Sequence, residues 1–136
     1  MAVIRNSNNN FSALSGAAFS QYDLLIQTTR GSLNELTVIK SASASNKPVG
    51  VAKYSASAAG ENVTAFGAGD KCLLRVGPGG STAGQYGKID STDFNEVVAY
   101  TPGVTTAVFC ICRFLETRSE NEYAEVELIL ANDAST

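Results

Sequence analysis

The sequence predicts an all-β fold arranged as a small β-barrel. Its apolar segments are short, roughly 5–9 residues each, and turn signals separate them about every 8–12 residues, as in sandwiches and barrels. No long window repeats apolar residues at the i, i+3, i+4, i+7 spacing of an amphipathic helix. The chain has 136 residues, 44% of them hydrophobic, which is enough for one domain with its own core.

Eight segments carry the strand pattern. The first, YDLLIQTT, ends at the turn signal Arg30-Gly31-Ser32, and Pro48 stands at the start of its segment, where a strand tolerates proline. Glycine-rich connections lie on both sides of KCLLRV. The expected strands cover residues 22–29, 36–45, 48–54, 62–66, 71–76, 96–101, 107–116 and 123–131. We therefore expect one β-barrel domain over residues 21–136.

Residues 1–20 predict an extended N-terminal arm. The stretch NSNNN is polar and turn-prone, and the few apolar side chains around it cannot form a core by themselves. SALSGAAF forms a helical turn at best, because Gly16 interrupts it. Such an arm is either disordered or becomes ordered on a partner surface. The residues expected to contact that partner are Val3, Ile4, Arg5, Phe11, Leu14 and Phe19.

The charges are unevenly distributed along the chain. The formal net charge is -3, which argues against a nucleic-acid partner. Residues 1–53 hold five basic and two acidic side chains, whereas residues 54–136 hold five basic and eleven acidic ones. This asymmetry favours head-to-tail contact between copies, although chance and solubility explain it equally well. The sequence has no apolar run that could span a bilayer, and we expect neither a membrane partner nor a secretory signal.

The glycine-rich stretch GPGGSTAGQYGK raises the question of a phosphate-binding loop. Such a loop needs a first glycine, a Gly-Lys pair followed by a hydroxyl residue, and then a helix. Gly87-Lys88 supplies the pair, but Thr82 stands where the first glycine belongs and Ile89 where the hydroxyl belongs. We therefore interpret this stretch as an exposed turn at a barrel rim, with glycines at positive φ.

No residue pattern predicts catalysis, a metal site or a cofactor. The chain has no histidine, the commonest general base. Glu125 and Glu127 would share one face of a strand, but we interpret them as part of a solvated acidic face. The thiols Cys72, Cys110 and Cys112 are expected to be buried and free, which suits a reducing compartment. We expect the protein not to be an enzyme.

Two parts of the sequence share an internal similarity. VGVAKYSASAAGENVTAF reads as a strand, a small polar connection, a glutamate and a second strand, and FCICRFLETRSENEYAEVELIL repeats that order with a longer connection. Glu61 precedes the second strand of the first unit, and Glu122 or Glu125 that of the second. Two such units around a central hairpin predict one barrel with rough internal symmetry.

Three segments within residues 48–130 carry motifs of one protein family. PVGVAKYSASAAGENVTAF is similar to that family's P-x-G-v-a … a-A-x-G-E-x-V stretch, and TAGQYG (residues 82–87) to its t-a-G-x-x-G turn. AVFCICRFLET … YAEVELIL resembles the closing return of the first pattern. In these motifs residues 48–130 resemble the capsid decoration, or cement, proteins of tailed bacteriophages. The chain departs from the family where Gln85 replaces the aspartate of a Gly-Asp pair, and where LETRSENEYAE replaces a second A-A-G-E.

The resemblance implies a β-tulip-like barrel and a structural role without catalysis. It implies a homotrimer on the outer surface of a virion capsid, made in the host cytoplasm, that binds the major capsid protein and stabilises contacts between its subunits. The arm of residues 1–20 would extend over that shell. The alternative is a ligand- or glycan-binding β module of a viral fibre or adhesin. The absence of tryptophan weakens that alternative without excluding it.

Overall fold

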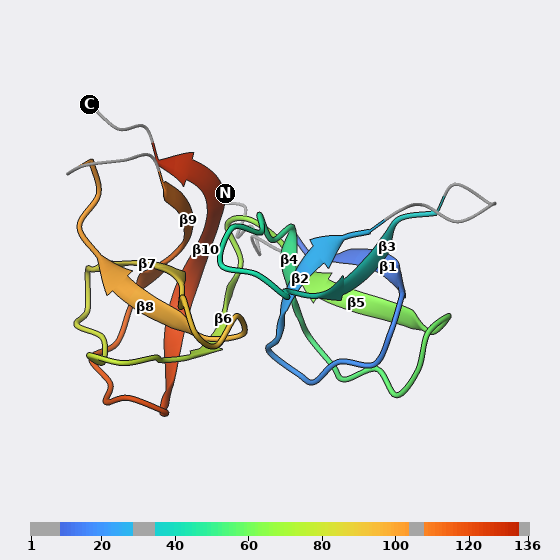
Figure 1. Ribbon diagram of the computed structural model, residues 1–136, viewed down its shortest axis with the longest axis horizontal. Helices are drawn as coiled ribbons and strands as arrows, with labels where there is room; N and C mark the ends of the chain where they lie inside the picture. Colours follow the sequence, from blue (N-terminus) through green and yellow to red (C-terminus); the bar gives the residue numbers. More distant parts are fainter. Residues whose placement is uncertain (1–8, 29–34, 104–107, 134–136) are drawn as a thin grey trace, which may run out of the picture.

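The computed structural model describes residues 9–28, 35–103 and 108–133, in which every regular element is a β-strand. The strands form two units that lie side by side (Figure 1). The N-terminal barrel contains β1 (Phe11–Ser15), β2 (Leu24–Gln27), β3 (Thr37–Lys40), β4 (Gly50–Ala52) and β5 (Asn62–Phe66). The C-terminal sheet contains β6 (Lys71–Arg75), β7 (Tyr86–Ile89), β8 (Val97–Tyr100), β9 (Val108–Phe114) and β10 (Tyr123–Asp133). The expected all-β fold with a closed barrel is confirmed.

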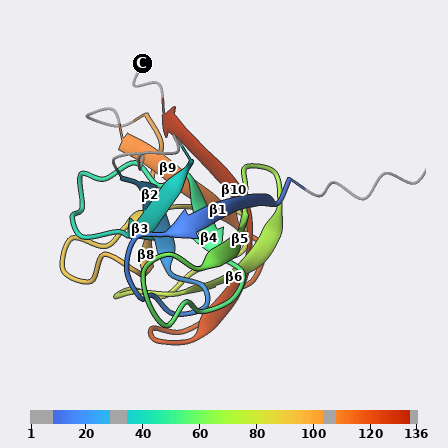
Figure 2. The ribbon, with the colours of Figure 1, turned by 90° about the vertical axis from the view of Figure 1, so that its right-hand side faces the viewer.

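The N-terminal barrel closes through its first strand. Its strand order is β1-β3-β2-β4-β5, and β1 pairs with β5 as well as with β3. Figure 2 shows β1 running across the front of the barrel between these two neighbours. The C-terminal sheet has the order β6-β10-β9-β7-β8, and a parallel bridge between Val76 and Val97 joins its two edges. The sheet therefore curls almost into a second barrel.

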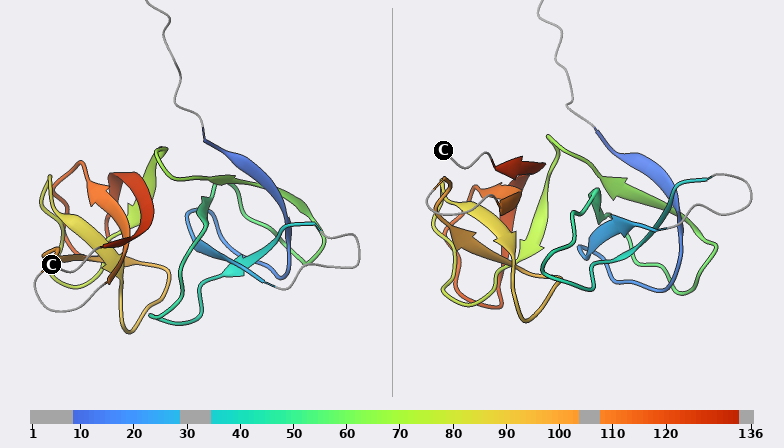
Figure 3. Two further views of the ribbon diagram at one scale, coloured as in Figure 1. Left: turned by 90° about the horizontal axis from the view of Figure 1, so that it is seen from above. Right: turned by 45° about the horizontal axis from the view of Figure 1, so that its top comes forward.

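Each unit has its own apolar core, because residues alternate between the inside and the outside of a strand. In β6, Cys72 and Leu74 are buried while Lys71 and Arg75 are exposed. The buried core of the barrel consists of Ala13, Phe19, Leu25, Val38, Ala52, Ala56, Val63 and Ala65. One short segment, residues 67–70, carries the chain from the barrel to the sheet (Figure 3). Asp70 Oδ1 accepts a hydrogen bond from Asn9 N at 2.6 Å, which fixes the start of the described chain beside this crossing.

The two units have the same topology. When β6 to β10 are matched in order with β1 to β5, every pairing of neighbouring strands in the barrel recurs in the sheet with the same direction. The one parallel contact of the barrel, between β1 and β3, recurs as the Val76–Val97 bridge. The barrel and the sheet are two versions of one five-stranded unit.

The register of the strands is also the same. Phe11 lies opposite Ala65 in the barrel, and Cys72 lies opposite Val126 in the sheet. Each residue of the second pair comes 61 positions later in the sequence than its counterpart in the first pair. We call two residues matched when they occupy the same place in the pairing of the two units. By this rule Leu24–Val51 matches Tyr86–Arg113, Val51–Phe66 matches Arg113–Glu127, and Ile26–Ile39 matches Lys88–Val98.

The loops repeat as well. Phe19 and Ala56 exchange two backbone hydrogen bonds in the barrel, and Ser81 and Arg118 do the same in the sheet. Positive backbone angles also fall at matched positions, with φ of 87° at Gly60 and 70° at Asn121, and 69° at Tyr22 and 94° at Gly84. L-residues rarely adopt such angles, so their recurrence supports a repeated unit.

Three expectations from the sequence are corrected here. The arm does not reach residue 20, because Phe11–Ser15 forms β1, whose backbone pairs close the barrel. The described part of residues 21–136 does not form one barrel, since it is divided between two units. The two segments of internal similarity correspond to β4–β5 and β9–β10, so they lie one in each unit instead of flanking a central hairpin.

A fourth difference concerns β7, which lies within the stretch expected to be a turn. Its residues YGKI carry little apolar pattern, but they pair with both β8 and β9. Gly87 is buried there, and a Cβ added at this position would lie 2.9 Å from Cys112 Sγ. The close packing of this core therefore requires glycine in a strand, where it otherwise signals a turn.

Candidate interaction surfaces

The glycine-rich loop between β6 and β7 is a turn, as predicted. Gly79, Gly80 and Gly84 all have positive φ, between 68° and 94°. Ser81, in the middle of the loop, is buried, and its Oγ donates to the backbone oxygen of Glu116. A strand follows the loop in place of a helix, so no helix N-terminus points at it. The loop lacks the geometry that would hold a phosphate.

The three thiols are free and buried in the C-terminal sheet. Burial raises the pKa of Cys72 to about 12 and that of Cys112 well above its ordinary value. In the described ranges, no three His, Cys, Asp or Glu side chains lie together as a metal site would require. Since the thiolate is the reactive form, these cysteines are poor nucleophiles in the folded protein.

The two carboxylates considered for catalysis lie on the outer face of β10. Glu127 Oε1 is 3.7 Å from Arg113 Nη2, and both side chains are partly exposed. Glu125 is exposed, and its backbone N–H donates to Glu116 Oε1 at 2.8 Å. The two carboxylates lie on a solvated face of the strand, as the sequence predicted, and Glu127 is paired there with Arg113.

The barrel and the sheet meet at an apolar joint. Leu24 and Val51 point away from the core of the barrel, yet neither is exposed, because both belong to the apolar cluster of the sheet. Tyr22 and Phe66 pack against the same cluster. We call these four residues the joint face of the barrel. Full burial of side chains of this size stabilises by about 1.5–3 kcal/mol each, so the joint fixes the two units against each other.

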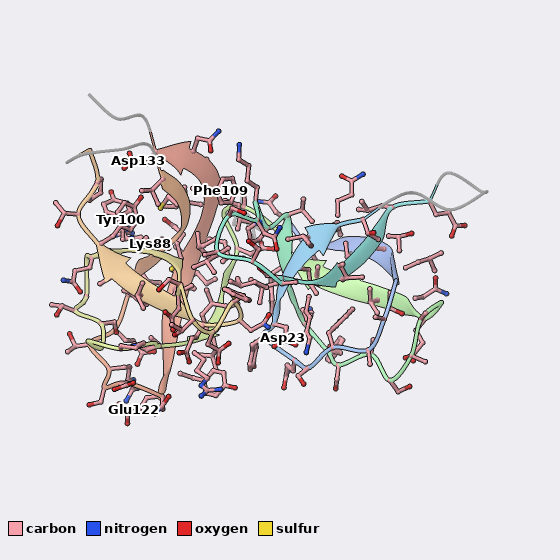
Figure 4. All side chains as sticks on the ribbon, in the orientation of Figure 1. Asp23, Lys88, Tyr100, Phe109, Glu122 and Asp133 are labelled. Carbon is pink, nitrogen blue, oxygen red and sulfur yellow. The ribbon has the colours of Figure 1, made fainter. Side chains whose placement is uncertain are left out.

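The sheet contributes Phe94 and Tyr123 to the joint, and we call them the receiving face. The rings of Tyr22 and Tyr123 are 5.7 Å apart and tilted by 57°. Phe94 packs against the cluster that also contains Leu24. Asp23 lies at the lower end of the region between the two units (Figure 4). Burial raises the pKa of its carboxyl group, and the charge of Asp93 adds to this shift.

The loop that carries Phe94 also holds two buried carboxyl groups. Asp90 and Glu96 are 4% and 6% exposed, and their side chains share a hydrogen bond. Arg75 Nε lies 3.2 Å from Glu96 Oε2. Burial, followed by the hydrogen bond to Asp90, raises the pKa of Glu96 to about 7. The pair therefore holds one proton at mildly acidic pH and loses it near neutrality.

A row of aromatic and charged side chains crosses the outer face of the C-terminal sheet. Strand pairing places one residue from each strand in line, and none of the five is buried. In order, the row consists of Tyr100, Tyr86, Arg113, Glu127 and Lys71. Its Tyr100 end lies on the side of the sheet away from the barrel (Figure 4). Tyrosine and arginine are enriched at protein interfaces, so the row is a candidate contact surface.

The outside of the N-terminal barrel has a hollow of about 270 Å³ where β1 meets β3. Its exposed rim carries a carboxylate, and half-buried leucines line its wall. The lining residues are Ser12, Ala13, Leu14, Glu35, Leu36 and Asn62. A larger groove, of about 1030 Å³, lies between residues 44–47 of the barrel and the sheet, near Lys88 and Phe109 (Figure 4).

The residues predicted to contact a partner are divided by the structure. Phe19 is 5% exposed and lies in the core of the barrel, and Phe11 packs against that core. Leu14 alone among the described candidates lines a surface hollow. The other three candidates, Val3, Ile4 and Arg5, lie outside the described residues. The sparse apolar residues of this stretch had suggested an arm, but some of them fill a very small barrel.

Sequence reasoning missed the row on the sheet, because its members are separated by up to 56 positions, the distance from Lys71 to Glu127. One signal was present in the sequence. Tyr86 and Arg113 match Leu24 and Val51, so a repeat aligned in full would have shown polar residues where the first unit has apolar ones.

The comparisons with known proteins support the fold. No protein-family model matches the chain, and no curated protein matches its sequence. Among solved structures, the chain is similar to the N base of the head fibre protein gp8.5 of bacteriophage phi29. The TM-score is 0.62 at 15% identity, and the match covers 92% of this chain and 97% of that chain. In the described residues, no helix could cross a membrane.

Proposed function

We propose that this protein is a structural component of a phage virion, a capsid decoration protein that binds the outside of the head without catalysis. The observation that carries this proposal is the likeness to a phage head fibre base, which covers nearly the whole of both chains. In this proposal the protein assembles as a homotrimer, binds the major capsid protein and stabilises contacts between its subunits.

The described surface supports a binding role. Away from the joint, Tyr54 is 61% exposed, and the row on the sheet adds further aromatic and charged groups. The cysteines are buried, and Glu127 on the solvated face of β10 is paired with Arg113. These features suit a protein that acts through contact area, as cement between capsid subunits does.

A second candidate is a ligand- or glycan-binding module of a viral fibre. It is favoured by the same likeness, because the similar structure is part of a fibre. Saturable binding of the isolated protein on a glycan array, without binding to heads, would select this candidate over the first.

The test is co-sedimentation with purified phage heads that lack this protein. Saturable binding to intact heads is the expected result, and no binding would reject the proposal. Deletion of residues 2–8 tests the predicted contacts of Val3, Ile4 and Arg5, since it removes these three residues but leaves β1 intact. We expect an unchanged melting temperature and weaker head binding. A deletion of residues 2–20 cannot serve, because it would remove β1 from the barrel.

A further inference from the structure

We infer that the joint between the two units is repeated between copies of the chain. The outer face of the C-terminal sheet of one copy would bind the hollow on the N-terminal barrel of the next. This inference rests on the proposed function only in that the function calls for a homo-oligomer. It names the two surfaces through which that oligomer forms.

The first observation is that the joint face has a matched counterpart on the sheet. Leu24 and Val51 pair across β2 and β4, and both are 0% exposed because the sheet covers them. Tyr86 and Arg113 pair in the same way across β7 and β9. They are not buried by any described part of the chain. We call Tyr86, Arg113 and Glu127, with Gly84 at the matched position of Tyr22, the open face.

The second observation is that the receiving face also has a matched counterpart, on the barrel. Ser15 pairs with Val38 in the barrel as Val76 pairs with Val97 in the sheet, so the β1–β3 edge of the barrel matches the β6–β8 edge of the sheet. Strand pairing matches Asn62 with Tyr123. Glu35 and Phe94 lie just before β3 and β8, each three residues before the bridged valine, and we take them as counterparts by this count. Asn62 and Glu35 line the barrel hollow. On the sheet, this position is the receiving face, which packs against the joint face. The equivalent position on the barrel is an open hollow.

The third observation is that each open surface carries one charge of opposite sign at a position that is apolar in the joint. Val51 belongs to the apolar cluster of the joint, and Phe94 packs against that cluster. Their counterparts are Arg113 on the open face, where it also lies beside Glu127, and Glu35 at the hollow. Opposite charges at matched positions favour this pairing, and they set it apart from the apolar joint within the chain. Tyr86, which matches Leu24, would pack on the leucines that line the hollow.

The geometry of the contact is head to tail. The open face lies on the sheet and the hollow on the barrel, so each copy uses one surface for each neighbour. Such a heterologous contact forms a closed ring when its rotation closes and a filament when it does not. For the proposed homotrimer, the ring would contain six units joined alternately by the joint within a chain and the contact between chains.

The experiment is charge reversal with rescue on the intact chain. Sedimentation velocity of the wild-type protein should show self-association, and Arg113→Glu and Glu35→Arg should each weaken it by at least ~10-fold. The double variant should recover most of the loss. A monomeric wild-type protein, or association that neither single variant weakens, would overturn the inference. So would weakening by both single variants without recovery in the double variant.

A matched control separates the contact from a general loss of charge or of folding. Arg118 is 44% exposed, Arg113 is 41% exposed, and each is paired with one glutamate. Arg118 lies in the β9–β10 connection, off the open face, so Arg118→Glu should leave association unchanged. Thermal melts check that every variant folds. Arg113→Glu also breaks the ion pair with Glu127, whereas Glu35→Arg on the exposed rim leaves that pair intact and so tests the contact independently. Head binding is measured separately on wild-type protein, so its absence would reject the proposed function and leave this inference standing.

Discussion

Leu24 and Tyr86 occupy the same position in the two units of this chain, and their surroundings are opposite. Leu24 is fully buried because the C-terminal sheet covers it, whereas Tyr86 is half-buried and no second sheet of the described residues covers it. The chain therefore shows in one molecule how this face looks when it is covered and when it is open. The predictions below follow from this relationship and from the repeated unit.

The joint should contribute strongly to stability. We expect Leu24→Ala to lower the free energy of unfolding by about 2–4 kcal/mol, because it removes a fully buried side chain between two units. Ile26→Ala, in the same strand but at a half-buried position, should cost less than half as much. Urea denaturation measures both. Equal costs for the two variants would show that the joint is not a tightly packed interface.

The matched positive φ angles predict that position 60 tolerates asparagine better than alanine. A Cβ added at Gly60 would meet no atom within 4 Å, so any cost comes from its φ of 87°. Gly60→Ala should lose about 1 kcal/mol of stability. Gly60→Asn should be closer to neutral, because asparagine tolerates this conformation and already occupies the matched position 121 at a φ of 70°. Thermal melts of the two variants should rank them in this order, and the reverse ranking would contradict the match.

Stability should fall as the pH rises through neutrality. The pKa of Glu96 is raised from 4.5 to about 7 in the folded protein, so folding favours its protonated form. This contribution is fully present below pH 4.5 and is lost as the pH passes about 7. Its size is on the order of 3 kcal/mol.

Replacement of that carboxyl tests the assignment. Glu96→Gln should be more stable than wild type at pH 8 and similar to it at pH 5, because the amide cannot ionise. The lowered pKa of Asp90 acts in the opposite direction, and only at lower pH. Urea titrations at several pH values measure the difference. An unchanged pH profile in the variant would remove Glu96 as the source.

The thiols should be protected in the folded state. Cys72, Cys110 and Cys112 are 7%, 4% and 0% exposed, and burial raises the pKa of each. At pH 8, a thiol reagent should label none of them quickly in native protein and all three after denaturation. Rapid labelling of one thiol in the native state would show that the C-terminal sheet opens locally.

The sequence was sufficient for the fold class but not for the division into units. In short segments such as KCLLRV, the alternation of apolar and polar residues indicates which side chains are buried. The strand predicted over residues 71–76 therefore agrees with β6 to within one residue at its end. β1 and β7 were missed because Phe11–Ser15 and Tyr86–Ile89 are short and rich in small or polar residues, and because β1 pairs with the distant β5 and β7 with the distant β9. The repeat was only partly visible, since matched residues such as Val51 and Arg113 differ in chemistry.

The candidate surfaces depend even more on tertiary structure. Phe11 and Phe19 were predicted to contact a partner, but a barrel of five short strands needs them for its own core. Leu14 was predicted as an arm residue that contacts a partner; it lines a hollow on the barrel, and its contact with a partner stays a prediction. The position of Arg113 opposite Tyr86 could not be predicted, because it depends on how distant strands pair.

The central claim is that this chain is a structural protein that assembles from copies of itself, and its mass in solution tests that claim most directly. Light scattering of the intact protein, measured as it elutes from a size-exclusion column, should give about three times the chain mass of 14.2 kDa. A single species at the mass of one chain, unchanged as the concentration is raised, would contradict the account.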